Sequence, residues 1–185
     1  MLHSSRRSWF SLLTAATLLL AGNGAPSRAV TPSAQAALND GYSLFYDFCS
    51  QESQLSLLLW VKSTPPAIAD YAKRISSTAK DDMALLTKMG AADSDLRLNK
   101  TPLPGFEINV RKSMSDDRKQ QLIFGTSGAA FAQAMTITQS ETTNYGLHVA
   151  KVLAETEPDP ARAHALHQMY ETWLALHNEA YRLSR

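Results

Sequence analysis

One long amphipathic stretch, residues 127–155, constrains the fold of this chain more than any other feature. Its larger side chains recur at steps of three and four, which places them on one face of an α-helix. These positions are Phe131, Met135, Thr138, Thr142, Tyr145, Val149 and Val152. We therefore expect one long helix whose inward stripe is apolar at both ends and polar at Thr138 and Thr142, in its middle.

The same spacing predicts three more long helices, over residues 34–62, 65–89 and 160–183. The run Ser63-Thr64-Pro65-Pro66 separates the first from the second, with Thr64 as the N-cap and proline in the first turn. Gly90 stands where a left-handed residue ends a helix. Because the turn between the first two helices is short, they should pack antiparallel.

The segment between the second and third long helices lacks this periodicity. Two prolines in the sequence TPLPG exclude a regular helix there, so residues 91–112 are predicted to form a crossover. A short helix is expected over residues 113–124, with Ser115 as its cap. No strand pattern, repeat or glycine-rich phosphate loop is found. The fold class is therefore all-α: a four-helix bundle of the ferritin-like type, with a long crossover between the second and third long helices and one extra short helix.

The first 29 residues have the three-part pattern of a signal peptide. Arg6 and Arg7 precede an apolar run at residues 9–22, and small residues flank Arg28 at a cleavage site near Ala29. The run is too short to span a bilayer, and no stop-transfer segment follows it. Residues 30–185 are thus expected to be a single domain, periplasmic or secreted, with no stable membrane anchor after leader removal.

The export route has two interpretations. The two arginines followed by Trp9 and Phe10 fit a twin-arginine signal, in which the protein crosses the membrane folded. A general secretory leader with two adjacent arginines fits equally, and the sequence leaves the choice open.

The charge of the chain excludes one class of partner. The 18 basic residues nearly balance the 17 acidic ones, and three of the basic residues lie in the leader, so the mature part is slightly acidic. Binding to nucleic acid is therefore not expected. Cys49 is the only cysteine, which excludes an intramolecular disulfide. A buried, inert thiol is the main interpretation, with a disulfide between chains as the alternative.

Several short segments make the chain resemble a known family. Residues 69–75 (ADYAKRI), 101–104 (TPLP), 131–139 and 174–177 are similar to the motifs of the exported ferritin-like bundles called domain of unknown function 4142. The resemblance covers about residues 40–183. It implies a ferritin-like fold and an exported protein.

The same comparison reveals departures from that family pattern. Residues 76–79 (SSTA) stand where the family has Asp-His, and Thr142 stands where it has a histidine. A glutamate is usual early in the first helix, and Gln54 takes that place here, with Glu52 two residues earlier. If those residues give the family a polar or metal site, this chain lacks most of it.

The remaining candidate metal ligands lie in the last predicted helix. His164, His167 and Glu171 recur at helical spacing near one face, and His177 is in step with the apolar stripe. Copper or zinc accepts imidazole ligands, so a copper or zinc bundle is one hypothesis. No Glu-x-x-His motif occurs, which argues against a di-iron oxidase. The alternative is a polar helix edge for the first three and a hydrogen-bonded core residue for His177.

A second hypothesis places a small-ligand pocket at the polar centre of the 127–155 helix, at Thr138, Thr142 and Tyr145. Threonine hydroxyls that bond back to their own helix are the alternative. The adjacent carboxylates Asp81 and Asp82 diverge on a helix and are expected to be solvated. No nucleophile, acid–base pair or cofactor motif is found. The leading hypothesis is thus a non-enzymatic exported bundle, without a cofactor, that serves in interaction or stress, with an unidentified protein partner and an undetermined oligomeric state.

Overall fold

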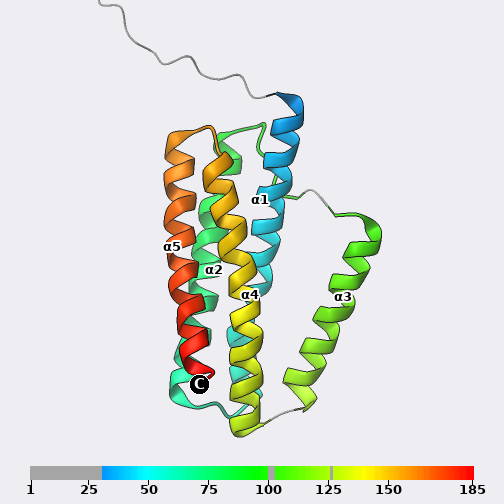
Figure 1. Cartoon of the computed structure of the whole chain (residues 1–185), viewed down its shortest axis with the longest axis vertical. Coiled ribbons are helices and arrows are strands. Elements are labelled where there is room, and N and C mark those ends of the chain that lie inside the picture. The colour runs from blue at the N-terminus through cyan, green and yellow to red at the C-terminus, as the bar shows by residue number, and fades with distance from the viewer. Residues whose placement is uncertain (1–30, 100–102, 126) are drawn as a thin grey trace, which may run out of the picture.

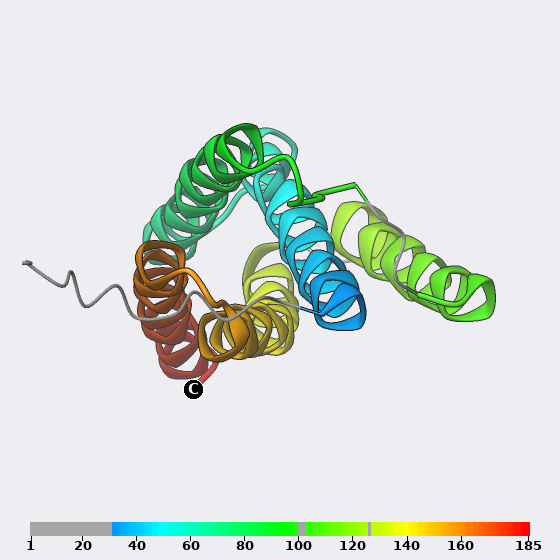
Figure 2. The same ribbon diagram turned by 90° about the horizontal axis from the view of Figure 1, so that it is seen from above.

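Four long helices form a bundle in the computed structural model, which describes residues 31–99, 103–125 and 127–185 (Figure 1). The bundle helices are α1 (Pro32–Glu52), α2 (Pro66–Ala92), α4 (Gly128–Thr156) and α5 (Pro160–Leu183). A fifth helix, α3 (Gly105–Gln120), stands outside the bundle beyond α1 (Figure 2). Short η1 (Leu55–Trp60) is 3₁₀-helical, and η2 (Gln121–Gly125) is a π-helical turn. The predicted all-helical class is confirmed, and the predicted leader, residues 1–29, lies outside the described residues.

Helix α1 starts as its sequence dictates but ends ten residues earlier than expected. Thr31 caps it by accepting a hydrogen bond from the amide of Ala34, and Pro32 is its first residue. After Glu52 the chain turns into η1, where the amide of Ser56 donates to Ser76 Oγ on α2 at 2.8 Å. A tertiary hydrogen bond thus replaces the continued helix, and the prediction of one helix over residues 34–62 is wrong beyond Glu52.

Helix α2 differs from the prediction at both of its ends. Thr64 does not cap it, because its hydroxyl donates to the carbonyl of Lys62, and the N-cap residue is Pro65. Gly90 is helical and not a left-handed terminator, since the helix continues to Ala92. A Cβ at Gly90 would lie 3.3 Å from Leu98 Cδ1, so this glycine makes room for the chain that follows.

Helix α3 begins within the predicted crossover, directly after Pro104, and so continues through Ser115, which the sequence suggested as a cap. Proline removes a donor that the first turn of a helix does not need. None of the α3 side chains is fully buried, and Phe106 is 82% exposed. Long side chains hold it to α4, among them Arg118, which pairs with Glu141 at 2.8 Å. The last third of the expected crossover is thus the start of a helix that is attached to the bundle through side-chain tips.

Helix α4 has the predicted position, but its buried face differs from the predicted stripe. The predicted steps average 3.5 residues, and such a stripe drifts by about 20° per heptad around a straight helix. Phe131 and Met135 are buried as expected, whereas Val152 is 56% exposed. The remaining buried positions are Thr136, Gln139, Thr143, Gly146, Leu147, Ala150 and Leu153. The drift turns the second half of the predicted stripe to the flank of α4 that faces α1.

The core lies between the four bundle helices and is built around aromatic side chains. Phe48 of α1 packs edge-on against Trp173 of α5, with 4.6 Å between ring centroids, and stacks on Phe45. Tyr71 is fully buried and donates to the carbonyl of Leu176 at 3.0 Å. The buried residues of α2 and of α5 recur at helical spacing, so each helix turns one face to this core. Cys49 is fully buried in this core, as the main interpretation required.

A buried ion-pair network closes one end of the bundle. The Tyr42 hydroxyl donates to Glu157 Oε2 at 2.5 Å, and Arg162 donates to Glu157 Oε1 at 2.9 Å and to Asp93 Oδ2 at 2.8 Å. Burial, followed by the bond to Glu157, raises the pKa of Tyr42 well above its usual range, so the phenol stays protonated and remains a donor. The network joins α1, α2 and the turn between α4 and α5.

Replacing Tyr42 with phenylalanine should lower the free energy of unfolding by about 2 kcal/mol, because one charge-assisted hydrogen bond to a buried carboxylate is lost. Arg162 and the amide of Asp159 still bond to Glu157, so the cost stays moderate. Urea denaturation measures this loss. An unchanged midpoint for the Tyr42→Phe variant would show that the bond contributes nothing net.

Candidate functional site: an apolar groove and a buried polar layer

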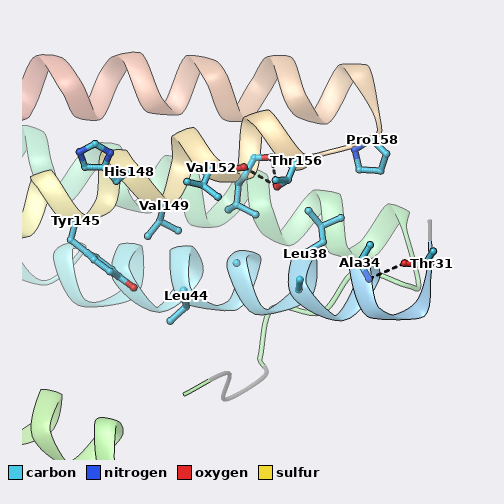
Figure 3. Close-up of a pocket in the computed structure, with 13 residues that line it drawn as sticks. Thr31, Ala34, Leu38, Leu44, Tyr145, His148, Val149, Val152, Thr156 and Pro158 are labelled. Carbon is cyan, nitrogen blue, oxygen red and sulfur yellow. Dashed lines mark hydrogen bonds between the residues drawn. The ribbon is translucent and has the colours of Figure 1, made fainter. Parts of the chain in front are cut away.

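An apolar groove runs between α1 and the C-terminal half of α4, which lie antiparallel (Figure 3). Its volume of about 730 Å³ falls within the usual range of small-molecule sites. Its lining residues come from the two helices and the turn after α4. They are Thr31, Ala34, Ala37, Leu38, Gly41, Leu44, Tyr145, His148, Val149, Val152, Leu153, Thr156 and Pro158.

The small residues of α1 account for the space in this groove. Ala34, Ala37 and Gly41 offer little or no side chain to the facing surface of α4. At Gly41 the two helices pack closely, since a Cβ there would lie 2.7 Å from Leu153 Cδ2. Valines of α4 supply the opposite wall, so the groove is narrow and aliphatic along its length (Figure 3).

The two ends of the groove carry different polar groups. Tyr145 and His148 mark one end, while Thr31, Thr156 and Pro158 mark the other (Figure 3). None of the described lining residues is Asp, Glu, Lys or Arg. The groove therefore suits an elongated apolar ligand with a polar group at one end.

The predicted polar pocket at the middle of α4 is not assembled as one site. Thr142 donates its hydroxyl to the carbonyl of Thr138 at 2.9 Å, so this threonine bonds back to its own helix. Tyr145 points away into the groove, where its ring stacks edge-on against Phe48 at 6.3 Å. Of the three predicted residues, Tyr145 lines the groove, whereas Thr138 and Thr142 are not among its lining residues.

A polar layer crosses the bundle interior at positions that the sequence analysis did not select. Glu52 and Gln139 are 8% and 3% exposed, and they come from α1 and α4. Asp82 of α2 accepts a 2.7 Å hydrogen bond from the indole of Trp173 on α5. Among the described residues, Glu52 Oε2 and Gln139 Oε1 are buried acceptors without a hydrogen-bond donor.

Burial shifts the protonation of this layer. Desolvation raises the pKa of Glu52 to about 7 against a weaker opposing effect of Gln139, and it raises the pKa of Asp82 to about 6. Burial also raises the pKa of the Cys49 thiol, and the neighbouring carboxyls of Asp82 and Glu52 add to the shift. The carboxyl groups of Glu52 and Asp82 are therefore mostly protonated, and so neutral, below about pH 6.

The prediction that Asp82 is solvated is wrong, and the sequence held a signal against it. Asp82 lies in step with Ile75, Ala79 and Leu86 on the buried face of α2. Glu52 similarly lies three residues after Cys49 on the buried face of α1. A carboxylate in phase with an apolar stripe thus indicates a buried acid when a donor such as Trp173 is present on a facing helix.

The four candidate metal ligands of α5 are not brought together. His167 lies 3.6 Å from Glu171, but both side chains are more than half exposed. His164 is exposed and shares a 3.1 Å hydrogen bond with Gln168. His177 faces α4, where its Nδ1 lies 2.9 Å from the Ser140 carbonyl oxygen. Across the described ranges, no group of three His, Cys, Asp or Glu residues has the geometry to hold a metal ion.

Comparison with known proteins does not assign this chain to a family. No protein-family model matches it, and no curated protein or solved structure gives a significant match. Within the described residues, none of the helices combines the length and the apolar character needed to cross a membrane. The groove and the residues around it are therefore the features of this chain that bear on its function.

Proposed function

We propose that this protein is an exported, non-enzymatic helical bundle that binds an elongated apolar ligand in the groove between α1 and α4. The observation that carries the proposal is the aliphatic groove of about 730 Å³, which no side chain of the described chain fills. A groove lined by alanine, leucine and valine gains free energy by removing an alkyl surface from water, at roughly 25 cal/mol per Å². The class of protein is thus a carrier or receptor of an apolar molecule.

The shape of the groove favours a linear ligand. Its α4 wall extends from Tyr145 to Thr156, which corresponds to about 16 Å at 1.5 Å per residue. An extended alkyl chain of about twelve carbons has a similar length, because each carbon–carbon bond of about 1.5 Å advances the zigzag by somewhat less. A single unbranched chain of this length therefore matches the groove.

The leader pattern supports the export part of the proposal. A periplasmic or secreted location fits residues 1–29, and the resemblance to domain of unknown function 4142 supports a ferritin-like ancestry. Metal binding through the α5 histidines stays a prediction, and no contact in the described residues favours it over the groove.

Binding of a fluorescent apolar probe, phenylnaphthylamine, tests the proposed function. The protein should enhance the probe's fluorescence with saturation at one site, and Val152→Asp should weaken binding by about tenfold or more, because it places a charge in the groove. Val152 is already 56% exposed, so this variant should fold.

Two further variants locate the probe. Val110→Asp makes the same chemical change on α3, outside the groove lining, and should leave binding unchanged. Ala37→Trp should block the groove by volume alone. Equal binding by the wild-type, Val152→Asp and Ala37→Trp proteins would rule out the groove as the site.

A further inference from the structure

We propose that the groove selects amphiphiles with an anionic head group, and that Arg111 of α3 is the residue that recognises the charge. This inference rests on the proposed function and deepens it, because it assigns the chemical class of the ligand. The alkyl chain would lie along the valines of α4, with its head at the Tyr145 end and its tail toward Pro158.

Arg111 is joined to the groove through Tyr145. Its Nη1 donates to the Tyr145 hydroxyl at 3.2 Å, and its guanidinium carbon lies 5.3 Å from the centre of that ring. The pairing is a cation–π contact as well as a hydrogen bond. The two contacts hold the positive charge of Arg111 at the Tyr145 end of the groove between α1 and α4.

The guanidinium keeps donor capacity in this arrangement. Nε donates to Glu107 at 2.8 Å, and Nη1 donates to Tyr145. Within the part of the chain that the structure describes, Nη2 has no recorded acceptor. The Arg111 and Glu107 side chains are 44% and 42% exposed, so an incoming anion can reach the guanidinium. A carboxylate or phosphate head can thus add to, or replace, the bond to Glu107.

The rest of the groove offers no competing charge. Its described lining contains no acidic residue, so no carboxylate there can pair with a positively charged head. The opposite end holds the hydroxyls of Thr31 and Thr156, which are neutral. A positively charged head would therefore meet repulsion at one end and no counter-charge at the other, whereas an anionic head has a partner.

Displacement of phenylnaphthylamine by three ligands of one chain length tests the inference. Dodecanoate, its methyl ester and undecyltrimethylammonium share an eleven-carbon alkyl tail and differ in head charge. Dodecanoate should bind about three- to tenfold more tightly than the ester, the size expected for a partly exposed ion pair, and the cation should bind most weakly. The difference should shrink as salt is added.

Variants of α3 identify the responsible residue. Arg111→Gln should bring dodecanoate affinity down to that of the ester, while leaving the ester's own affinity unchanged. Glu107→Gln should raise dodecanoate affinity, because it removes the carboxylate that competes for Arg111. Arg118→Gln is the matched control, since Arg118 lies on the same helix but pairs with Glu141 and touches no lining residue.

The outcomes separate this inference from the proposed function. If the probe binds and all three ligands displace it equally, head-group selection is overturned while the apolar groove stands. If the dodecanoate preference persists in Arg111→Gln, the assigned residue is wrong. If neither the probe nor any ligand binds, the proposed function itself fails.

Discussion

The free energy of unfolding should fall by a few kcal/mol as the pH rises from about 5 to about 8, opposite to the acid lability of most proteins. The cause is the buried layer, in which burial raises the pKa of Glu52 to about 7 and that of Asp82 to about 6. In the unfolded chain both carboxyls titrate near 4.

The sign follows from which state holds more protons. Between about pH 4 and pH 7 the folded protein keeps protons on Glu52 and Asp82 that the unfolded chain has already released, so raising the pH favours unfolding. Each raised pKa contributes about 3 kcal/mol to the free energy of unfolding. This contribution is complete below about pH 4 and is lost as the pH rises through the pKa of the group in the folded protein.

Urea denaturation at several pH values measures this dependence. Glu52→Gln should remove the part of the pH dependence that is due to Glu52. It should also be more stable than the wild type at about pH 8, because a neutral amide places no charge in the buried layer. Asp82→Asn should remove the part of the pH dependence that lies below about pH 6, where Asp82 titrates in the folded protein. A wild-type stability that is flat or rises across this range would contradict the buried-layer interpretation.

Replacing Gly146 with alanine should destabilise the bundle by about 3 kcal/mol or more, because overpacking of a rigid contact costs 1–3 kcal/mol and occasionally more. A Cβ at Gly146 would lie 2.1 Å from Phe48 Cζ, far inside van der Waals contact. The Phe48 ring also contacts Phe45, Tyr145 and Trp173, so moving it away from a new Cβ would disturb these contacts. Thermal or urea unfolding measures the loss.

Gly105→Ala is the matched control, since a Cβ at that helical position meets no atom within 4 Å. It should change stability by less than about 1 kcal/mol. In a double-mutant cycle, Phe48→Ala should cancel most of the cost of Gly146→Ala, because the clashing ring is gone. Equal effects of the two glycine substitutions would show that α1 and α4 are farther apart than described.

The sequence predicted a helix best where nearby residues, such as an N-cap or a proline in the first turn, determine its ends. Helix α5 begins after Asp159, whose side chain accepts from the amide of Arg162, and its bounds were predicted correctly. The end of α1 was missed because Ser56 bonds to Ser76, twenty residues away. No local pattern contains such a bond. For α3, two prolines were taken as evidence against a helix that in fact begins directly after the second.

The candidate site was only partly predictable, for a physical reason. Tyr145 and Val149 were placed on the inward stripe because of their regular spacing, and Tyr145 was also assigned to a polar pocket with Thr138 and Thr142. Their true role depends on the small residues of the facing helix, Ala37 and Gly41, which leave the space between α1 and α4 unfilled. Whether an apolar residue fills a core or lines a groove depends on the size of the residues that face it on the neighbouring helix. The periodicity of one helix carries no information about those facing residues.

Because α3 is loosely attached, ligand choice and folding stability depend on different parts of the chain. Helix α3 buries none of its side chains fully and reaches α4 through Arg111 and Arg118, while the four bundle helices hold the core. With the role that we propose for Arg111, substitutions on α3 would alter head-group preference with little effect on folding, since most surface substitutions change stability by less than about 0.5 kcal/mol. Descendants of one stable bundle can thus diversify in ligand choice by drift along a single helix.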